Sequence, residues 1–133
     1  MLLEIKQEIF NMLQNELGYR VTDNPYQQEL EEIFPTVFLT LSNANRVNVK
    51  NNGFICKFTF KIDIFSEYNG EKEIMLMEED IAALIPDLME RFEYIIGVSE
   101  NSFKILDDKS TSVVRKHGVI LYSITAAGQY KEV

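Results

Sequence analysis

The most regular pattern of hydrophobic and polar positions lies in residues 54–65, which read FICKFTFKIDIF. Every even position is apolar, while the odd positions run through Ile55, Lys57, Thr59, Lys61, Asp63 and Phe65. A period of two residues predicts a β-strand with one buried face. The run is about twice as long as a usual strand, so its second face needs a separate explanation.

Two other stretches repeat their apolar residues every three or four positions, which predicts amphipathic helices. The first covers residues 2–17, and Gly18 follows it as a stop signal. The second covers residues 71–92 and is interrupted by Pro86. Because proline lacks a backbone N–H and clashes with the preceding turn, we expect this helix to kink or to restart at Pro86.

A second strand is predicted to begin at Pro35, in the run PTVFLTLSN. Residues 43–53 are rich in asparagine and end in Asn52-Gly53, so they predict a long or flexible loop that closes an antiparallel hairpin with residues 54–65. Residues 19–34 show no sustained period and predict an extended connection, with a short helical turn at 27–32.

The C-terminal part predicts two more strands, at residues 102–106 and 113–124. Gly97 precedes them as a separator, and Gly118 is a candidate bulge. Residues 126–133 are expected to form a flexible tail.

The elements follow the order helix, strand, strand, helix, strand, strand. This order predicts one α+β domain over residues 1–133, with an antiparallel β-sheet of about four strands and two α-helices packed on one face. A chain of 133 residues is long enough for one hydrophobic core.

The overall charge narrows the function. A net charge of −8 argues against a protein whose main task is to neutralise nucleic-acid phosphates. The single cysteine, Cys56, falls on the apolar face of its strand and is expected to be a buried thiol. The N-terminus lacks the features of a signal peptide, which favours a cytoplasmic site of synthesis and use.

The charge is also unevenly distributed. Residues 1–34 and 67–93, the predicted helical parts, hold seven and nine acidic side chains and two basic ones each. The remaining strands and loops hold five acidic and nine basic side chains. Acidic helix exteriors are commonly just solvated surface; the alternative is that an acidic and a basic surface meet between subunits.

No motif indicates catalysis, a cofactor or a metal. His117 is the only histidine, and no nucleophile-elbow sequence accompanies it. The run Glu78-Glu79-Asp80 cannot converge on one site, because successive helical residues point about 100° apart. One cysteine and one histidine make no zinc-type ligand set, and the six glycines form no phosphate-binding loop.

Several sequence segments, taken in order, resemble a known family. They are a helix ending LGYRV, an irregular linker, the run FPTVFLTL, a long alternating strand that continues into FSEYNGEKE and a helix, and two final strands ending GVILYSI. Over residues 5–124 the chain resembles the tail completion proteins of long-tailed bacteriophages and prophages, also called tail terminator or tail-to-head joining proteins.

The resemblance implies a structural virion protein rather than an enzyme. Such proteins form a homohexameric ring that ends the tail tube, contacts the tail tube protein and a head-completion protein, and surrounds a channel through which DNA passes without sequence-specific binding. The chain would be assembled in the cytoplasm of the bacterial host and reside in the virion neck, with no cofactor, metal or membrane involved.

Three alternatives remain open at this stage. The first is a head-closure or minor capsid protein of the phage neck, and the second is a cytoplasmic α+β module that binds a protein by strand addition. The third is a small enzyme that uses His117 with a carboxylate. For an assembly role, the predicted subunit or partner interface consists of Arg46, Lys50, Lys57, Thr59 and Lys61.

Overall fold

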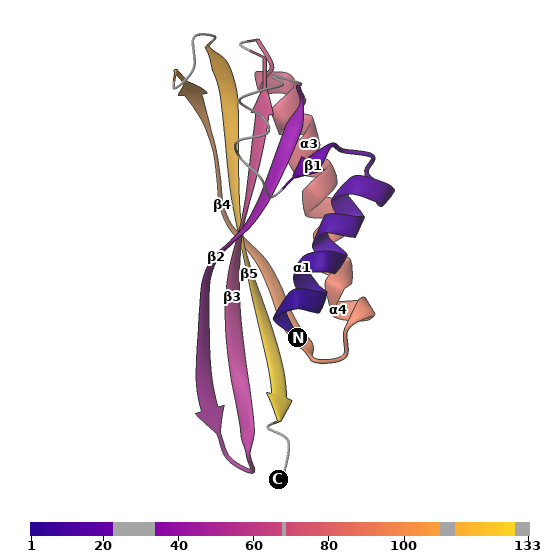
Figure 1. The fold of residues 1–133 in the computed structure, drawn as a ribbon, viewed down its shortest axis with the longest axis vertical. Helices are drawn as coiled ribbons and strands as arrows, with labels where there is room; N and C mark the ends of the chain where they lie inside the picture. The colour runs from indigo at the N-terminus through magenta and orange to yellow at the C-terminus, as the bar shows by residue number, and fades with distance from the viewer. Residues whose placement is uncertain (23–33, 68, 110–113, 130–133) are drawn as a thin grey trace.

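The computed structural model describes residues 1–22, 34–67, 69–109 and 114–129. Five strands form one sheet in the order β1-β2-β3-β5-β4, and the helices lie on one face of it (Figure 1). The strands are β1 Val21–Thr22, β2 Thr36–Val49, β3 Gly53–Ser66, β4 Ile95–Asp108 and β5 Arg115–Gln129. The helices are α1 Leu2–Asn11, α3 Glu71–Leu84 and α4 Leu88–Arg91.

The predicted fold class, an antiparallel sheet of about four strands in the order helix, strand, strand, helix, strand, strand, is wrong. β1 adds a fifth strand and pairs with β2 in parallel, whereas the other three pairings are antiparallel, so the sheet is mixed. Strands hold 52% and helices 32% of the described residues. The sequence contains no sign of β1, because two residues are too few to show a period. β1 pairs with Val37 and Phe38, and the backbone N–H of Val37 donates to the carbonyl of Arg20, the residue just before β1, at 2.8 Å.

The predicted flexible loop at residues 43–53 is also wrong, although β2 and β3 do pair antiparallel. β2 continues to Val49, and the connection is a tight turn in which the N–H of Gly53 donates to the carbonyl of Lys50 at 3.3 Å. Asn51 and Asn52 adopt φ of 61° and 63°, a left-handed conformation that asparagine tolerates well. The low strand propensity of this segment is overridden by its pairing with β3.

The strand predicted at residues 54–65 is confirmed as β3, together with its buried face. The side chains at all its even positions are buried in the main core. Cys56, one of them, is buried as expected. The alternation of apolar and polar residues in the sequence therefore correctly predicts which side of this central strand faces the helices.

The two C-terminal strands are longer than predicted. β4 begins at Ile95 rather than at residue 102, so Gly97 lies inside a strand, and Ala126–Gln129 belong to β5 rather than to a flexible tail. The register between β3 and β5 is unbroken at Gly118, so the predicted bulge is absent there. Glycine is needed for another reason: a Cβ at this position would lie 2.5 Å from Cγ2 of Ile74 on α3. Residues 27–32, 113 and 130–133 lie outside the described part of the chain.

Both helical predictions are confirmed. α1 continues as a π-helical segment over Met12–Glu16, and the chain leaves it through Gly18 at φ +74°. The second helix divides at Pro86, which lies in a 3₁₀ turn, Ile85–Asp87, between α3 and α4. The buried side chains of the helices pack on β2, β3 and β5 in a single cluster: Ile5, Ile9, Met12, Leu13, Ile74, Met77, Ile81, Ile85 and Leu88.

Polar contacts tie the helical layer together. The guanidinium of Arg91 donates to carboxylate oxygens of Glu8 at 2.7 Å and of Glu16 at 2.6 Å. The hydroxyl of Tyr19 donates to Asp80 at 2.9 Å, which joins the segment after α1 to α3. Within the described residues, no helix is long and apolar enough to cross a membrane.

Candidate interaction surface

Three of the predicted interface residues share the face of the sheet that lies opposite the helices, which we call the outer face. Lys57, Thr59 and Lys61 alternate along β3 with its buried positions. Their partners on β5 are Thr125, Ser123 and Leu121, so this part of the outer face is polar and basic. The Nζ of Lys61 lies 3.5 Å from Oδ1 of Asp63.

The other two predicted residues are placed elsewhere. Arg46 pairs with Cys56 in the register of β2 and β3, so its side chain lies on the helix face of the sheet. There its Nε lies 3.2 Å from Sγ of Cys56, and its guanidinium carbon lies 4.6 Å from the centre of the Phe54 ring. Lys50 is exposed in the turn that joins β2 to β3. The five residues therefore do not form one cluster.

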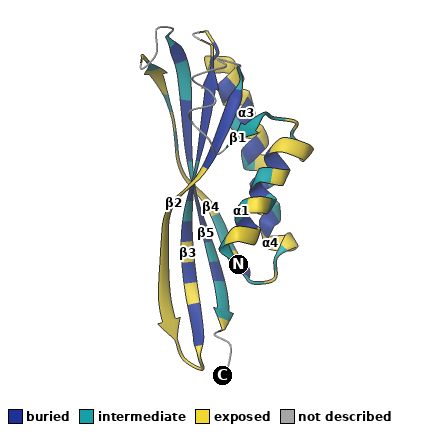
Figure 2. Cartoon of the chain, in the orientation of Figure 1, coloured by how far each residue is buried: buried dark blue, intermediate teal, exposed yellow. Residues whose placement is uncertain are grey.

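Beyond a register shift at Leu41/Asn43, the β2–β3 hairpin extends as a projection that we call the arm, residues 43–58. Figure 1 shows the arm reaching past the start of α1. Every residue of its β2 side is exposed, which Figure 2 shows as a continuous exposed edge. The outer face of the arm carries exposed apolar side chains, with Val47 63%, Val49 46% and Ile55 37% exposed. Sequence reasoning missed the two valines, although the alternation RVNV was a signal for them.

The opposite end of the outer face holds a packed polar cluster around His117. Its Nε2 lies 2.6 Å from Oδ1 of the buried Asp63, and its ring stacks on that of Phe65 at 4.2 Å. The guanidinium carbon of Arg115 lies 4.4 Å from the centre of the Phe65 ring, and Nε of Arg115 donates to Oδ2 of Asp108 at 2.6 Å. The His117–Asp63 and Arg115–Asp108 contacts join β5 to β3 and β4, while Nη1 of Arg115 is buried without a hydrogen-bond partner among the described residues.

His117 does have a carboxylate partner, as the enzyme hypothesis requires. The nearby Ser66, however, is opposite Lys116 in the β3–β5 register, while His117 is opposite Phe65. Neighbouring residues of a strand point to opposite faces, so Ser66 and His117 lie on different sides of the sheet. They cannot form a serine–histidine pair.

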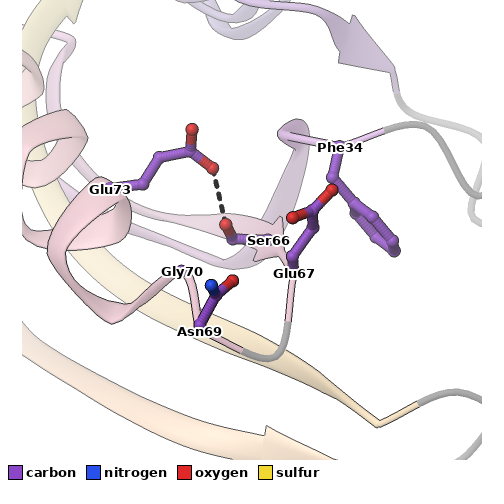
Figure 3. Close-up of a pocket in the computed structure, with 6 residues that line it drawn as sticks. All are labelled: Phe34, Ser66, Glu67, Asn69, Gly70 and Glu73. Carbon is purple, nitrogen blue, oxygen red and sulfur yellow. Dashed lines mark hydrogen bonds between the residues drawn. The ribbon is translucent and has the colours of Figure 1, made fainter.

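A polar pocket lies where β3 passes into α3, and Figure 3 shows its lining. The hydroxyl of Ser66 donates to Oε1 of Glu73 at 2.5 Å across the turn. Gly70 begins the helix with no room for a side chain, since a Cβ there would lie 1.9 Å from Oγ of Ser66. The pocket also includes Phe34, Glu67 and Asn69. The Ser66–Glu73 hydrogen bond at this pocket joins the end of β3 to the first turn of α3.

Gly70→Ala should therefore destabilise the fold. We expect the free energy of unfolding to fall by about 1–3 kcal/mol, because Ser66 and the turn must move to admit the methyl group. Gly97→Ala is the matched control, since a Cβ at Gly97 has its nearest neighbour at 3.7 Å. Urea denaturation of both variants checks the prediction, and equal stability losses would contradict it.

An unusual carboxyl pair lies on the helix side, near the β4 edge. The protonated carboxyl of Glu100 on β4 donates a hydrogen bond to the carboxylate of Glu78 on α3. Partial burial, this hydrogen bond and the charge of Glu78 together raise the pKa of Glu100 to about 7. The hydroxyl of Tyr122, directly opposite Glu100 in the β4–β5 register, is buried and has no hydrogen-bond partner among the residues that the structure describes. Sequence reasoning missed the pair, because its members come from distant segments.

The pair predicts a pH dependence of stability. Because the pKa of Glu100 is raised on folding, the folded chain binds more protons than the unfolded chain between about pH 4.5 and pH 7. The contribution of Glu100 to the free energy of unfolding is therefore complete at the lower pH and is lost as the pH rises through 7. Denaturation midpoints across this range should fall with pH in the wild type and fall less in Glu100→Gln. Glu90→Gln, at an exposed carboxyl on α4, is the control; a slope unchanged by Glu100→Gln would refute the assignment.

No group of three or more histidine, cysteine, aspartate or glutamate side chains in the described ranges could hold a metal ion. A scan against protein-family models and a search of curated proteins found no match to the chain. The case for a function therefore rests on the sequence and on the surfaces described above.

Proposed function

We propose that this chain is a structural subunit that ends the tail tube of a long-tailed bacteriophage or prophage and joins it to the head, by forming a homohexameric ring around the DNA channel. The observation that carries the proposal is the arm. Its β2 side is exposed along its whole length, and its outer face presents Val47, Val49 and Ile55 to solvent. The helix-facing side chains of the arm, such as Phe54 and Phe58, already belong to the core of the monomer, whereas the β2 side and the apolar outer face would be buried only by a neighbouring subunit.

The distribution of charge supports the same proposal. The helices, which are rich in acidic residues, all lie on one side of the sheet, and the arm carries Arg46, Lys50 and Lys57 without an acidic residue. In a ring, each subunit presents one surface to a different surface of the next, so unlike charges favour head-to-tail contact. An acidic channel wall would also let DNA slide, because it does not bind phosphates.

Two alternatives are kept. A head-closure or minor capsid protein of the neck would use the same surfaces with different neighbours. A cytoplasmic module that binds a protein by strand addition is favoured by one observation: β4 lies at the edge of the sheet and pairs only with β5 among the described strands.

Deletion of the gene from the phage or prophage that encodes it tests the function. We expect tails of abnormal length and heads without tails in electron micrographs, and restoration of joined particles when the gene is supplied from a plasmid. Normal particles after deletion, or genome neighbours unrelated to tails and heads, would overturn the proposal.

A further inference from the structure

The sheet ends in two long edges along which no further strand of the described residues pairs. β1 pairs with β2 only at Val37 and Phe38, so no other strand in the described ranges covers that side of β2 from Leu39 to Val49. At the opposite end of the sheet, β4 pairs with β5 alone. Free edges of this length present rows of backbone N–H and C=O groups that can pair with another chain.

The directions of the strands make the two edges compatible. β2, β3, β5 and β4 are neighbours in this order, and each pairing is antiparallel. β4 therefore runs opposite to β2. If a second copy continues the sheet in the same orientation, its β2 meets the first copy's β4 antiparallel, which is slightly the more stable of the two ladder types.

The register identifies which groups point outward from β2. The N–H of Val37 donates to Arg20 on the β1 side, so its partner Ile64 turns its backbone groups away from β2 and toward β5. The β3–β5 register has no shift, so every even residue of β3 does the same. Ala44 is opposite one of them, Phe58, and therefore turns its N–H and C=O to the free edge of the arm.

The backbone groups of β4 alternate in the same way. Phe60 turns its backbone groups toward its β5 partner, Tyr122, which consequently turns its own toward β3 and away from β4. Glu100 is opposite Tyr122, so its N–H and C=O point to the free edge of β4. Ala44 and Glu100 thus carry outward backbone groups on the two opposite edges.

The charges of the edges are complementary. Between Leu39 and Gly53 the chain holds two basic residues, Arg46 and Lys50, and no acidic residue. The β4 edge carries the Glu78–Glu100 carboxyl pair at its helix side. Two carboxyl groups held side by side are stabilised by an approaching cation, and the arm of another copy brings such cations to the β4 edge.

We infer that copies of this chain join by antiparallel strand addition, with the β2 edge of one arm pairing with the β4 edge of the next copy. The inference rests on the proposed ring and names its contact. Because the two edges differ, the contact is heterologous: each copy keeps one free edge after pairing, and the chain of contacts ends only when a ring closes. All helices then lie on the same side of a continuous sheet.

Two edge-blocking variants test the contact. Ala44→Pro and Glu100→Pro each remove one outward N–H, and proline is tolerated at such edge positions because the N–H is not part of the internal ladder. Ala44→Ser and Glu100→Asp keep the N–H and serve as controls. Circular dichroism and thermal melts establish that each variant is folded, and sedimentation velocity measures its mass.

Each proline variant alone should associate at least about tenfold more weakly than the wild type, whereas both controls should assemble normally. An equimolar mixture of the two proline variants should form a 1:1 heterodimer and nothing larger, because each supplies the edge that the other lacks.

The inference would be overturned if either proline variant assembled like the wild type, or if the mixture stayed monomeric. A monomeric wild type would overturn both the inference and the ring. If the wild type forms rings and both proline variants form the same rings, the proposed function stands and this contact is wrong. If the wild type forms only open filaments but the two proline variants still form a heterodimer, the contact is supported and the ring is contradicted.

Discussion

Phe60→Ala is expected to lower the free energy of unfolding by about 3–5 kcal/mol. Phe60 is fully buried near the middle of β3, the central strand of the five. Its ring belongs to the cluster in which the helices pack on the sheet. Truncation to alanine removes apolar contacts and leaves a cavity that the rigid sheet cannot close. Since domains of this size are stable by about 5–15 kcal/mol, the variant should lose a large share of its stability.

Thr59→Ala is the matched control, because Thr59 directly precedes Phe60 in the same strand and lies on the outer face. We expect a change within about 0.5 kcal/mol for the control. Urea denaturation at one pH compares the three proteins. Equal losses for Phe60→Ala and Thr59→Ala would mean that the assignment of the two faces of β3 is wrong.

Reversing the charge of the arm with Lys50→Glu and Lys57→Glu together should weaken self-association about a hundredfold, with folding retained. Both side chains are exposed, so neither contributes to the core. Like charges placed together across an interface cost several kcal/mol, and a hundredfold change in the dissociation constant corresponds to about 2.7 kcal/mol. Sedimentation equilibrium measures the dissociation constant.

The control for this charge reversal is the double variant Lys6→Glu and Lys72→Glu, which makes the same change of charge on the helices. It should associate nearly as the wild type does. Added salt should weaken wild-type assembly, because exposed charges are screened over about 10 Å at 0.1 M salt. If the arm variant assembled as well as the helix control, the arm would not be the contact surface.

The sequence predicts well those elements whose periodic pattern comes from a one-sided core. β3 alternates between buried and more exposed residues from Phe54 to Lys61, and α1 and α3 repeat their apolar residues with helical spacing, because these segments bury one side only. Pro86 likewise acts through its own backbone, so the division between α3 and α4 could be anticipated. These are local effects that need no knowledge of the partner strands.

Other elements depend on their neighbours and escape such reasoning. β1 is defined by its parallel pairing with Val37 and Phe38 of β2, and the β2 side of the arm has no buried face to create a pattern. β4 contains two register shifts, Ile95/Gly97 and Glu100/Ser102, which break its alternation. Gly118 is explained by Ile74, a residue far away in the sequence.

The residues of the candidate surface also divide into those that a local sequence pattern predicts and those that depend on neighbouring elements. The shared face of Lys57, Thr59 and Lys61 follows from the period of a strand, and the structure places them together. Arg46 lies on the other face because of a register that no single-strand pattern contains. The Glu78–Glu100 pair unites a helix and an edge strand, so only the packing of α3 on the sheet reveals it.

Native mass spectrometry of the purified wild-type chain tests the central claim, that the chain closes into a ring through unlike surfaces. The account predicts one dominant assembly of six copies of the 15.4 kDa chain, in equilibrium with monomer as the protein is diluted. A monomer at every concentration, a dimer that grows no further, or an open-ended series of masses would contradict it.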